Sequence, residues 1–471
     1  MDSLSPELLD AIIGHVDGQK LAPLATLSRT WQYQVERRTF AKLAVRSPDL
    51  DFFIAAVVGS RRRVLRQLSF HVVLPTFADP DNDEDRQRNN TAFTQHVHAL
   101  FRTLATWDLG SDPSPVSLSI EAYSINKHGL RRHVWERRLR YPTIELATTD
   151  GLDSVPLITK LEPGGGYSVH VPGSSIASIA SRLPNLSSIS AHFREDREML
   201  DIALRRQNRH KLATALQTVP TEHLVDFSVH IPSFCPHNEL RPAPNVLRQD
   251  AIDHLSLALH HLLRAPNLTS FGIHDGTTIS PGLFRPIEDE HFPNLEHVQI
   301  DFTRCAPDGE WYFDGDPTDV AHSSDEEEEE EGERDSDDYD PEHFSSRAEQ
   351  VAKLACGAAP IRPYRCKAVP ERVRPLFVAA AEAAQRMPRL RAFGLRTRLE
   401  VEEEDVGECS VNYAAPGVEC MLDRDFIETM EADRQKPRCY TCVPGMEEDA
   451  EIRDAWIKVR EGCLIRETIS G

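Results

Sequence analysis

The residues best suited to chemistry are the two cysteines of "RCYTCVP", Cys439 and Cys442. A Cys-x-x-Cys pair serves redox exchange where it opens a helix after a strand, and it binds zinc where a second pair of ligands lies nearby. The other cysteines of this region, Cys409, Cys420 and Cys463, form no second close pair. If the segment is a strand, side chains three apart point to opposite faces. We therefore predict no metal or redox site here.

Other motifs give no stronger sign of catalysis. The segment "EPGGGY", residues 162–167, lacks the lysine and hydroxyl residue of a phosphate-binding loop, so we interpret it as a turn. The 20 histidines include no H-E-x-x-H motif, and we expect His254, His260 and His261 on the wetter side of a leucine-rich helix. The sequence therefore predicts no catalytic residue, no cofactor and no metal, and an α/β enzyme is the least favoured functional hypothesis.

The net charge of −22 is concentrated in one segment. Residues 325–340 hold 12 acidic residues and one arginine. Such a segment repels itself and cannot bury apolar surface, so we predict a disordered acidic insertion at about residues 307–345. Ser323, Ser324 and Ser336 precede carboxylates there and are candidate phosphorylation sites for acid-directed kinases, with an unmodified solvated loop as the alternative.

The remaining charge argues against nucleic acid as a partner, because the rest of the chain is only mildly acidic. The basic cluster at residues 131–140 is interpreted as a solvated helix face. No apolar run approaches the roughly 18 residues of a membrane span, and the N-terminus lacks the pattern of a signal peptide. We expect a soluble protein of the cytoplasm or nucleus, without a membrane partner, whose nine cysteines are mostly buried thiols.

The elements begin with a compact helical segment. Ser5 and Pro6 are typical of a helix start, and an apolar stripe at helical spacing comes after them. After "DGQK", a second short helix and a third helix capped by Ser28 are predicted. A unit of about forty residues cannot bury all of these apolar side chains by itself. Some of them are therefore expected to face another surface.

The segment "LSPELLDAIIGHVDGQKLAPLATLSRTWQYQVE" resembles an F-box, the three-helix module that docks on the Skp-type adaptor of SCF ubiquitin ligases. It departs from the common pattern at Ser5, where many members have leucine directly before proline, and at Pro23 within the second helix. An ordinary helical cap on a larger domain is the alternative. The resemblance implies that the apolar positions matching the motif bind the adaptor: Leu4, Pro6, Leu8, Leu9, Ile12, Ile13, Leu21, Leu24, Leu27 and Trp31.

Beyond this segment, helical and alternating patterns succeed one another. A recurrent joint of proline, a polar residue and leucine connects helix to strand at Leu186, Leu268, Leu295 and Leu390. We predict an α/β fold with an F-box at residues 1–39 and an irregular leucine-rich-repeat-like solenoid with a parallel strand edge at 40–400. A single doubly wound α/β domain is the alternative.

Residues 401–471 are predicted to form a C-terminal cap that closes the last open layer of the solenoid. An amphipathic helix near the C-terminus carries Ile452, Trp456 and Val459 on one side. A partner-binding helix is the alternative.

An F-box ahead of degenerate repeats is similar to the F-box proteins that are numerous in filamentous fungi. The resemblance implies a non-catalytic substrate receptor of an SCF-type E3 ubiquitin ligase, which acts in protein degradation. Such a receptor binds the Skp adaptor, and through it cullin, while its repeat surface holds a protein substrate. The sequence does not identify that substrate. The alternative is a ligase-independent scaffold for protein–protein interaction, in which the N-terminal helices only cap the solenoid.

Overall fold

The computed structural model describes residues 4–16, 21–75, 83–107, 115–124, 143–162, 169–193, 201–285, 291–319, 354, 357, 362–400, 406–419, 434–447 and 449–467. The chain forms two compact units. The first comprises Met1–Asn126, Pro142–Val171 and Ile179–Ala191, and the second comprises Lys127–Tyr141, Pro172–Ser178 and His192–Gly471. Both combine helices with a mostly parallel sheet, which confirms the predicted α/β class. Among the described residues, no helix has both the length and the apolar character needed to cross a bilayer.

The first unit opens with three helices that start where the sequence predicts. They are α1 (Pro6–His15), α2 (Leu21–Leu24) and α3 (Arg29–Thr39). The hydroxyl of Ser5 accepts a hydrogen bond from the Leu8 N–H, and that of Ser28 accepts one from the Trp31 N–H. Both serines therefore cap the first turn of the adjoining helix.

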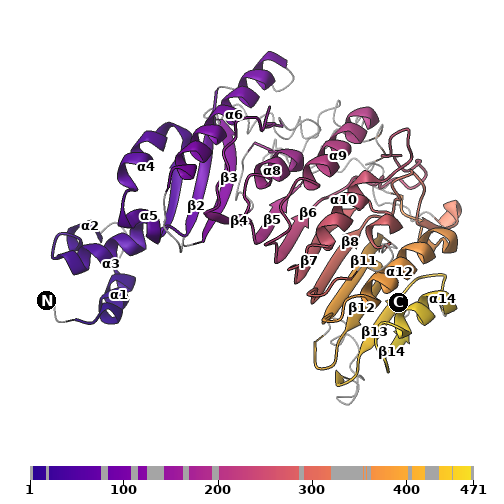
Figure 1. The fold of residues 1–471 in the computed structure, drawn as a ribbon. Helices are drawn as coiled ribbons and strands as arrows, with labels where there is room; N and C mark the ends of the chain where they lie inside the picture. The colour runs from indigo at the N-terminus through magenta and orange to yellow at the C-terminus, as the bar shows by residue number, and fades with distance from the viewer. Residues whose placement is uncertain are drawn as a thin grey trace, which may run out of the picture. The chain divides into compact units, whose positions relative to one another are not determined.

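The rest of the first unit is a parallel sheet with helices beside it. Its strands lie in the order β1 (Lys42–Arg46), β2 (Gln67–Leu74), β3 (Val116–Ser124), β4 (Ile158–Glu162) and β5 (Ser188–His192). The connections carry η2 (Ser47–Asp49), α4 (Leu50–Ala56), α5 (Ser60–Val64) and α6 (Asp83–Ala105), whereas α8 (Gly173–Ala180), ahead of β5, has its residues up to Ser178 in the second unit. In Figure 1, α4 and α6 lie against one face of this sheet.

One predicted cap is wrong. The sequence suggests that Ser47 caps the helix after β1, but Ser47 lies inside the 3₁₀ turn η2, which precedes α4. Its hydroxyl instead accepts a hydrogen bond of 3.0 Å from the Val73 N–H, next to the end of β2. The serine therefore ties a connection to a neighbouring strand rather than starting a helix.

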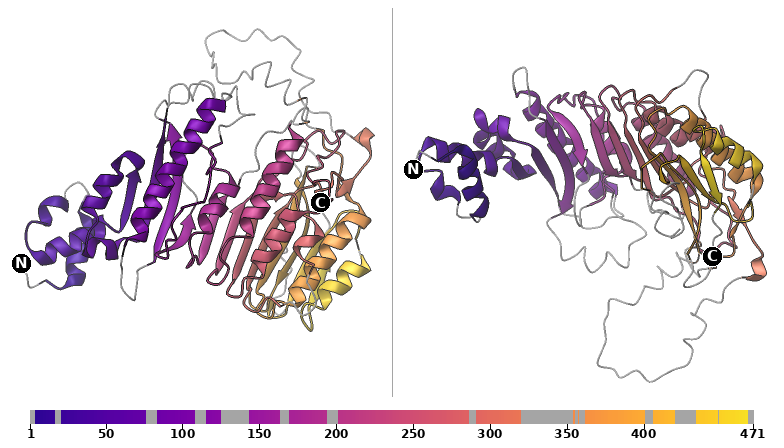
Figure 2. Two further views of the ribbon diagram at one scale, coloured as in Figure 1. Left: turned by 45° about the horizontal axis from the view of Figure 1, so that its top comes forward. Right: turned by 90° about the horizontal axis from the view of Figure 1, so that it is seen from below.

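The second unit continues the alternation of helix and strand. Its sheet has the order β6 (Asp226–His230), β7 (Ser270–Thr277), β8 (His297–Phe302), β11 (Ala392–Glu400), β12 (Val406–Ala414), β13 (Arg438–Cys442) and β14 (Leu464–Glu467). Strand β12 runs antiparallel to both of its neighbours, and the other pairs are parallel. The helices α9 (Ile202–Leu216), α10 (His254–Leu263), α12 (Pro370–Gln385) and α14 (Ala450–Ile457) lie on one face of this sheet (Figure 2).

The predicted joints lie where a core needs them. All four joint leucines, at positions 186, 268, 295 and 390, are buried. In the second unit they lead into strands whose apolar residues stand in register, such as Phe227 beside Phe271 and Phe271 beside Val298. The proline–polar–leucine pattern therefore marks the entry of each strand into the core, as predicted.

The C-terminal region confirms the predicted helix and adds to it. Ile452, Trp456 and Val459 are buried, and α14 packs beside α12. The same region also contributes β12, β13 and β14 to the sheet, of which only β13 has a counterpart in the sequence analysis. The C-terminal end of the fold is therefore a layer of both strands and helix.

The predicted start of the acidic insertion at residue 307 is wrong. Residues 307–319 are part of the described structure and include β9 (Phe313–Asp314) and η4 (Pro317–Asp319). Tyr312 and Phe313 are buried, and β9 pairs with β10 (Lys367–Ala368). The rest of the predicted insertion, including Ser323, Ser324 and Ser336, lies outside the described residues, as do residues 131–140 and most of "EPGGGY".

Candidate functional site

The three N-terminal helices enclose a small core of their own. It consists of Leu9, Ile13, Leu21, Trp31 and Val35, all buried, with Leu24 packed against them. Four residues that match the adaptor-binding motif therefore lie inside the helical unit rather than on its surface, including Trp31. Their role in this structure is to hold the three helices together.

Other motif residues point outward. The exposed fractions of Leu4, Leu8, Ile12 and Leu27 are 37%, 55%, 41% and 52%. Leu8 and Ile12 are four residues apart on α1, which places them on one helix face. We call these four residues the apolar surface of the N-terminal helices. The side chain of Pro6, the remaining matched residue, lies outside the described residues.

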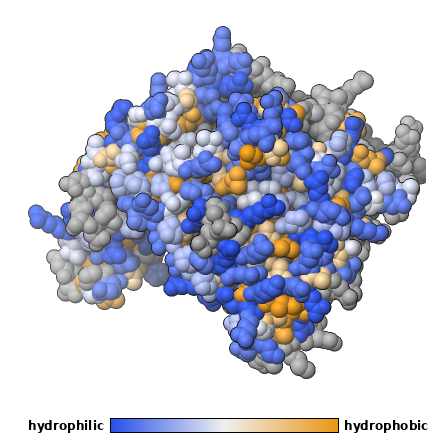
Figure 3. All heavy atoms as spheres, turned by 45° about the vertical axis from the view of Figure 1, so that its right-hand side comes forward, coloured by the Kyte–Doolittle hydropathy of each residue, from blue (hydrophilic) through white to orange (hydrophobic). Residues whose placement is uncertain are grey.

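Exposed apolar residues also occur elsewhere. In the first unit Phe52, Ile54 and Val58 lie on α4 and just after it, and in the second unit Leu257 lies on α10 and Ile457 on α14. On the face shown in Figure 3, hydrophobic residues occur in small groups among hydrophilic ones. Scattered exposed leucines of this kind are normal for a protein surface and need no partner.

An ion pair joins α3 of the helical unit to α5, further along the chain. The guanidinium of Arg61 on α5 donates to the Glu36 carboxylate on α3 over 2.7 Å. This bond lowers the pKa of Glu36 below its ordinary value, because it stabilises the charged form. Arg61 also lies over the Phe40 ring, 4.7 Å from its centroid. The helix α3 is therefore fixed at one end while α1 keeps its outer face free.

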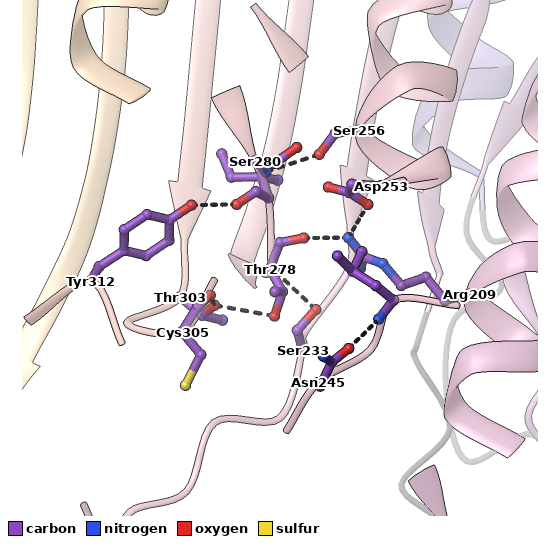
Figure 4. Close-up of polar contacts among 12 residues, drawn as sticks. Arg209, Ser233, Asn245, Asp253, Ser256, Thr278, Ser280, Thr303, Cys305 and Tyr312 are labelled. Atoms are coloured by element: carbon purple, nitrogen blue, oxygen red, sulfur yellow. Dashed lines mark hydrogen bonds and ion pairs between the residues drawn. The ribbon is translucent and has the colours of Figure 1, made fainter. Parts of the chain in front are cut away.

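A second group of polar residues lies in the loops beyond β6, β7 and β8 (Figure 4). Arg209 on α9 donates to the Asp253 carboxylate over 2.9 Å and to the Thr278 carbonyl over 2.7 Å. Burial tends to raise the pKa of Asp253, but Arg209 and nearby hydroxyls outweigh it and hold that pKa below its ordinary value. Both charges are buried, so each depends on the other for compensation.

Further bonds extend this network across the loops. The Tyr312 hydroxyl donates to the Ile279 carbonyl over 2.7 Å, and the hydroxyls of Thr278 and Thr303 lie 3.2 Å apart. Burial raises the pKa of Tyr312 well above its usual range. These groups are bonded to one another (Figure 4). The arrangement fixes the loops in place.

Glu239 forms the centre of a neighbouring buried cluster. Its carboxylate accepts hydrogen bonds from the Arg304 guanidinium and from the backbone N–H groups of Tyr364 and Arg365, the latter two over 2.6 and 2.5 Å. Burial raises the pKa of Glu239, against the opposing effect of these donors. The carboxylate therefore ties together segments on both sides of the acidic stretch. Nothing in the local sequence around Glu239, Arg209 or Asp253 distinguishes these residues from surface charges.

The cysteines differ from the prediction at one pair. Cys235 and Cys305 form a disulfide, so these two are not the free thiols that the sequence predicts. They are 70 residues apart, and no motif connects them. Cys439 and Cys442 are buried on β13, so the strand that the sequence analysis considered for this segment is present.

The histidines of α10 are also only partly as predicted. His260, expected on the wetter side, is buried, and its Nδ1 lies 2.9 Å from the Leu283 carbonyl, to which it donates. His254 is partly exposed and pairs with Asp250 over 2.7 Å, while His261 is exposed. One bonded partner on η3 (Pro281–Leu283) thus makes burial of a histidine possible.

Neither a protein-family model nor a curated protein matches this sequence.

Proposed function

We propose that this chain is the substrate receptor of an SCF-type ubiquitin ligase, a non-catalytic F-box protein of the cytoplasm or nucleus. The observation that carries the proposal is the division of the N-terminal apolar residues. Five of them close a core, and four others stay exposed on the same small unit. Apolar residues that stay exposed together on so small a unit suit a surface that another molecule covers.

The partner of this surface is a Skp-type adaptor, and through it cullin. A helix that presents apolar residues at positions i and i+4, as α1 does with Leu8 and Ile12, suits a hydrophobic groove on a partner. Leu4 is exposed in the residue before the Ser5 cap, and Leu27 is exposed in the turn after α2. The chain itself performs no bond chemistry; it raises the effective concentration of a target near the transferase.

We infer that the remaining α/β structure is an irregular leucine-rich-repeat-like solenoid, whose surface holds a protein substrate. Parallel strands entered through buried leucines support this inference. Further support comes from the asparagines of the joints. Asn267 donates to the Glu222 carbonyl over 2.7 Å, and Asn294 donates to the Pro266 carbonyl over 2.7 Å. Each repeat is thereby bonded to the turn of the repeat before it.

The test is adaptor binding by the full chain with Leu8→Ala and Ile12→Ala combined. Anchor residues of an interface each contribute about 2 kcal/mol or more, so the pair should lower affinity for recombinant Skp adaptor by at least about 10²-fold. A matched control replaces Leu257 and Ile457, which are exposed by 45% and 40%, with alanine. This control should bind the adaptor as the unmodified chain does.

A thermal melt accompanies both variants. Because Leu8 and Ile12 are exposed, their replacement should leave the melting temperature nearly unchanged. Wild-type affinity in the Leu8/Ile12 variant, or no adaptor binding by the unmodified chain, would overturn the proposal.

The second candidate is a ligase-independent scaffold in which the helices only cap the solenoid. The attachment of α3 to α5 through Glu36 and Arg61 favours it, since a terminal cap must be fixed to the next layer. The two candidates differ in what accompanies the purified chain: adaptor and cullin co-purify with a receptor and do not co-purify with a scaffold.

A further inference from the structure

Three side chains of the second unit come together near the C-terminal ends of β5, β6 and β7. The ring nitrogens of His192 and His230 and a carboxylate oxygen of Asp275 all lie within 4.8 Å of one another. His192 and His230 are the last residues of β5 and β6, and their rings stack with centroids 4.4 Å apart. His230 Nδ1 lies 2.9 Å from Asp275 Oδ2. Two imidazoles and one carboxylate thus converge on one point.

A distortion of β7 brings Asp275 to this point. Along a regular strand, side chains alternate between faces, so Asp275 would point away from the face that His274 shares with His230. The register of β7 with β8 shifts between Ile273 and Thr277, and both Asp275 and Gly276 have positive φ angles, 68° and 73°. A bulge of this kind redirects one side chain, and positive φ at a residue other than glycine is uncommon.

The neighbouring histidine is held by other partners. His274 Nε2 lies 3.2 Å from the Ser228 hydroxyl, and its Nδ1 lies 4.0 Å from Asp301. Gly272 makes room for this ring, because a Cβ there would lie only 2.7 Å from His274 Nε2. Asp301 is itself paired with Arg396 over 2.8 Å. The carboxylate of Asp275 is therefore the one placed to act with His192 and His230.

We propose that His192, His230 and Asp275 bind a divalent transition-metal ion, with zinc the best match to this donor set. Zinc takes imidazole nitrogen and carboxylate oxygen at about 2.0–2.2 Å in tetrahedral geometry. Tetrahedral donors at that distance lie about 3.4 Å apart, so the present 2.9 Å between His230 and Asp275 opens by only about half an ångström. The ion takes the place of the proton that now joins the two side chains.

The site is accessible, and its three donors leave the coordination of the ion open. The side chains of His230 and Asp275 are 34% and 51% exposed, so an ion reaches them from solvent. A fourth position remains for water or for a carboxylate or imidazole of a bound protein. The metal would accordingly add a contact point at these strand ends, and this inference does not depend on the adaptor proposal.

The test measures zinc binding by the full chain after removal of metal with a chelator, using equilibrium dialysis with zinc alone. We expect one zinc ion per chain, with affinity reduced at least about 100-fold by His230→Ala and at least about 10-fold by Asp275→Asn. Asparagine tolerates positive φ, so Asp275→Asn keeps the bulge and the fold even if His230→Ala does not. The control is His254→Ala, which removes a histidine of similar exposure from a His–Asp pair with no third donor among the described residues.

Cobalt(II) serves as a second probe because its spectrum distinguishes nitrogen and oxygen donors from thiolates. A spectrum without a thiolate charge-transfer band supports the site, and such a band would assign the metal to the cysteines instead. The proposal is overturned if the unmodified chain binds no zinc. It is also overturned if Asp275→Asn binds zinc as tightly as the His254→Ala control does.

Discussion

At the scale of single residues, the joint asparagines illustrate what the sequence can and cannot predict. The pattern of proline, polar residue and leucine predicts a buried leucine at the start of a strand, which the structure confirms at all four joints. The pattern does not reveal that the polar residue donates a hydrogen bond to a backbone carbonyl elsewhere in the chain. Asn185 bonds to the Pro156 carbonyl and Asn267 to that of Glu222, acceptors 29 and 45 residues upstream. Partners at such separations are set by the fold, so local periodicity carries no information about them.

Asn267→Ala should therefore destabilise the chain although Asn267 is an exposed residue. The substitution removes one hydrogen bond and leaves the Glu222 carbonyl without this donor, at a cost of about 1 kcal/mol. For a chain of this size, that corresponds to a fall of about 1–2 °C in melting temperature, measured by calorimetry. The control is Arg389→Ala, at the equivalent position of the fourth joint, which should melt as the unmodified chain does. Equal shifts in the two variants would show that the asparagine bond contributes nothing.

The buried charges make the same point more strongly. Arg209, Asp253 and Glu239 have no sequence signal, since charged residues are usually exposed. Their burial depends on partners that arrive from other loops, as Figure 4 shows for Arg209. His192, His230 and Asp275 belong to the same class, because three strands must pair before these side chains meet.

At the scale of elements, the hydrophobic period predicts the alternation of helix and strand, and the error at residue 307 is instructive. Aspartate and glycine around "WYF" suggest a loop, yet Trp311, Tyr312 and Phe313 are buried. Three consecutive aromatic residues should outweigh their polar neighbours, since each can bury a large apolar area. The predicted start of the insertion followed the acidic composition, whereas the buried aromatic residues place the folded structure further along the chain.

Replacement of residues 321–352 by a flexible Gly/Ser linker of about ten residues should leave the melting temperature within a few degrees. The reason is that β9 and β10 pair on either side of this stretch, and Arg365 bonds to Asp314 over 3.0 Å, so both ends are already held. The entropic cost of closing a loop depends only weakly on the length of the loop.

Gly315→Val supplies the contrast in the same region. A Cβ at Gly315 would lie 1.8 Å from the Tyr364 carbonyl oxygen, so β9 and β10 could not pair. This variant should melt well below the unmodified chain. A linker variant that melts as low as Gly315→Val would show that the replaced stretch supports the fold.

At the scale of the whole molecule, the proposed location bears on the disulfide. A receptor of the cytoplasm or nucleus works where thiols are kept reduced. The loop that carries Cys235 does not depend on the disulfide alone, because Glu239 binds Arg304, the residue before Cys305. The fold at this point is therefore compatible with either oxidation state.

If the proposed location is right, Cys235 and Cys305 should be reduced in the cell, although they are joined by a disulfide in the structure. Cells are quenched in acid, the protein is denatured, and thiols are alkylated before any reduction, with the modified cysteines identified by mass spectrometry. Denaturation is needed because Cys305 is buried. Recovery of the two cysteines as a disulfide would contradict the proposed location, while Cys439 and Cys442, which are thiols in the structure, serve as internal controls.

Because strands pair across the acidic stretch, the folded structure does not depend on an unbroken chain there. Strand β8 precedes the stretch and β11 comes after it, yet they are direct neighbours in the sheet, and Glu239 binds the backbone of Arg365 from across the same gap. A protease that cuts between residues 320 and 361 would break none of these bonds. The two fragments would then remain associated as a non-covalent heterodimer. Such a nick would be visible on a denaturing gel while the particle kept its size in solution.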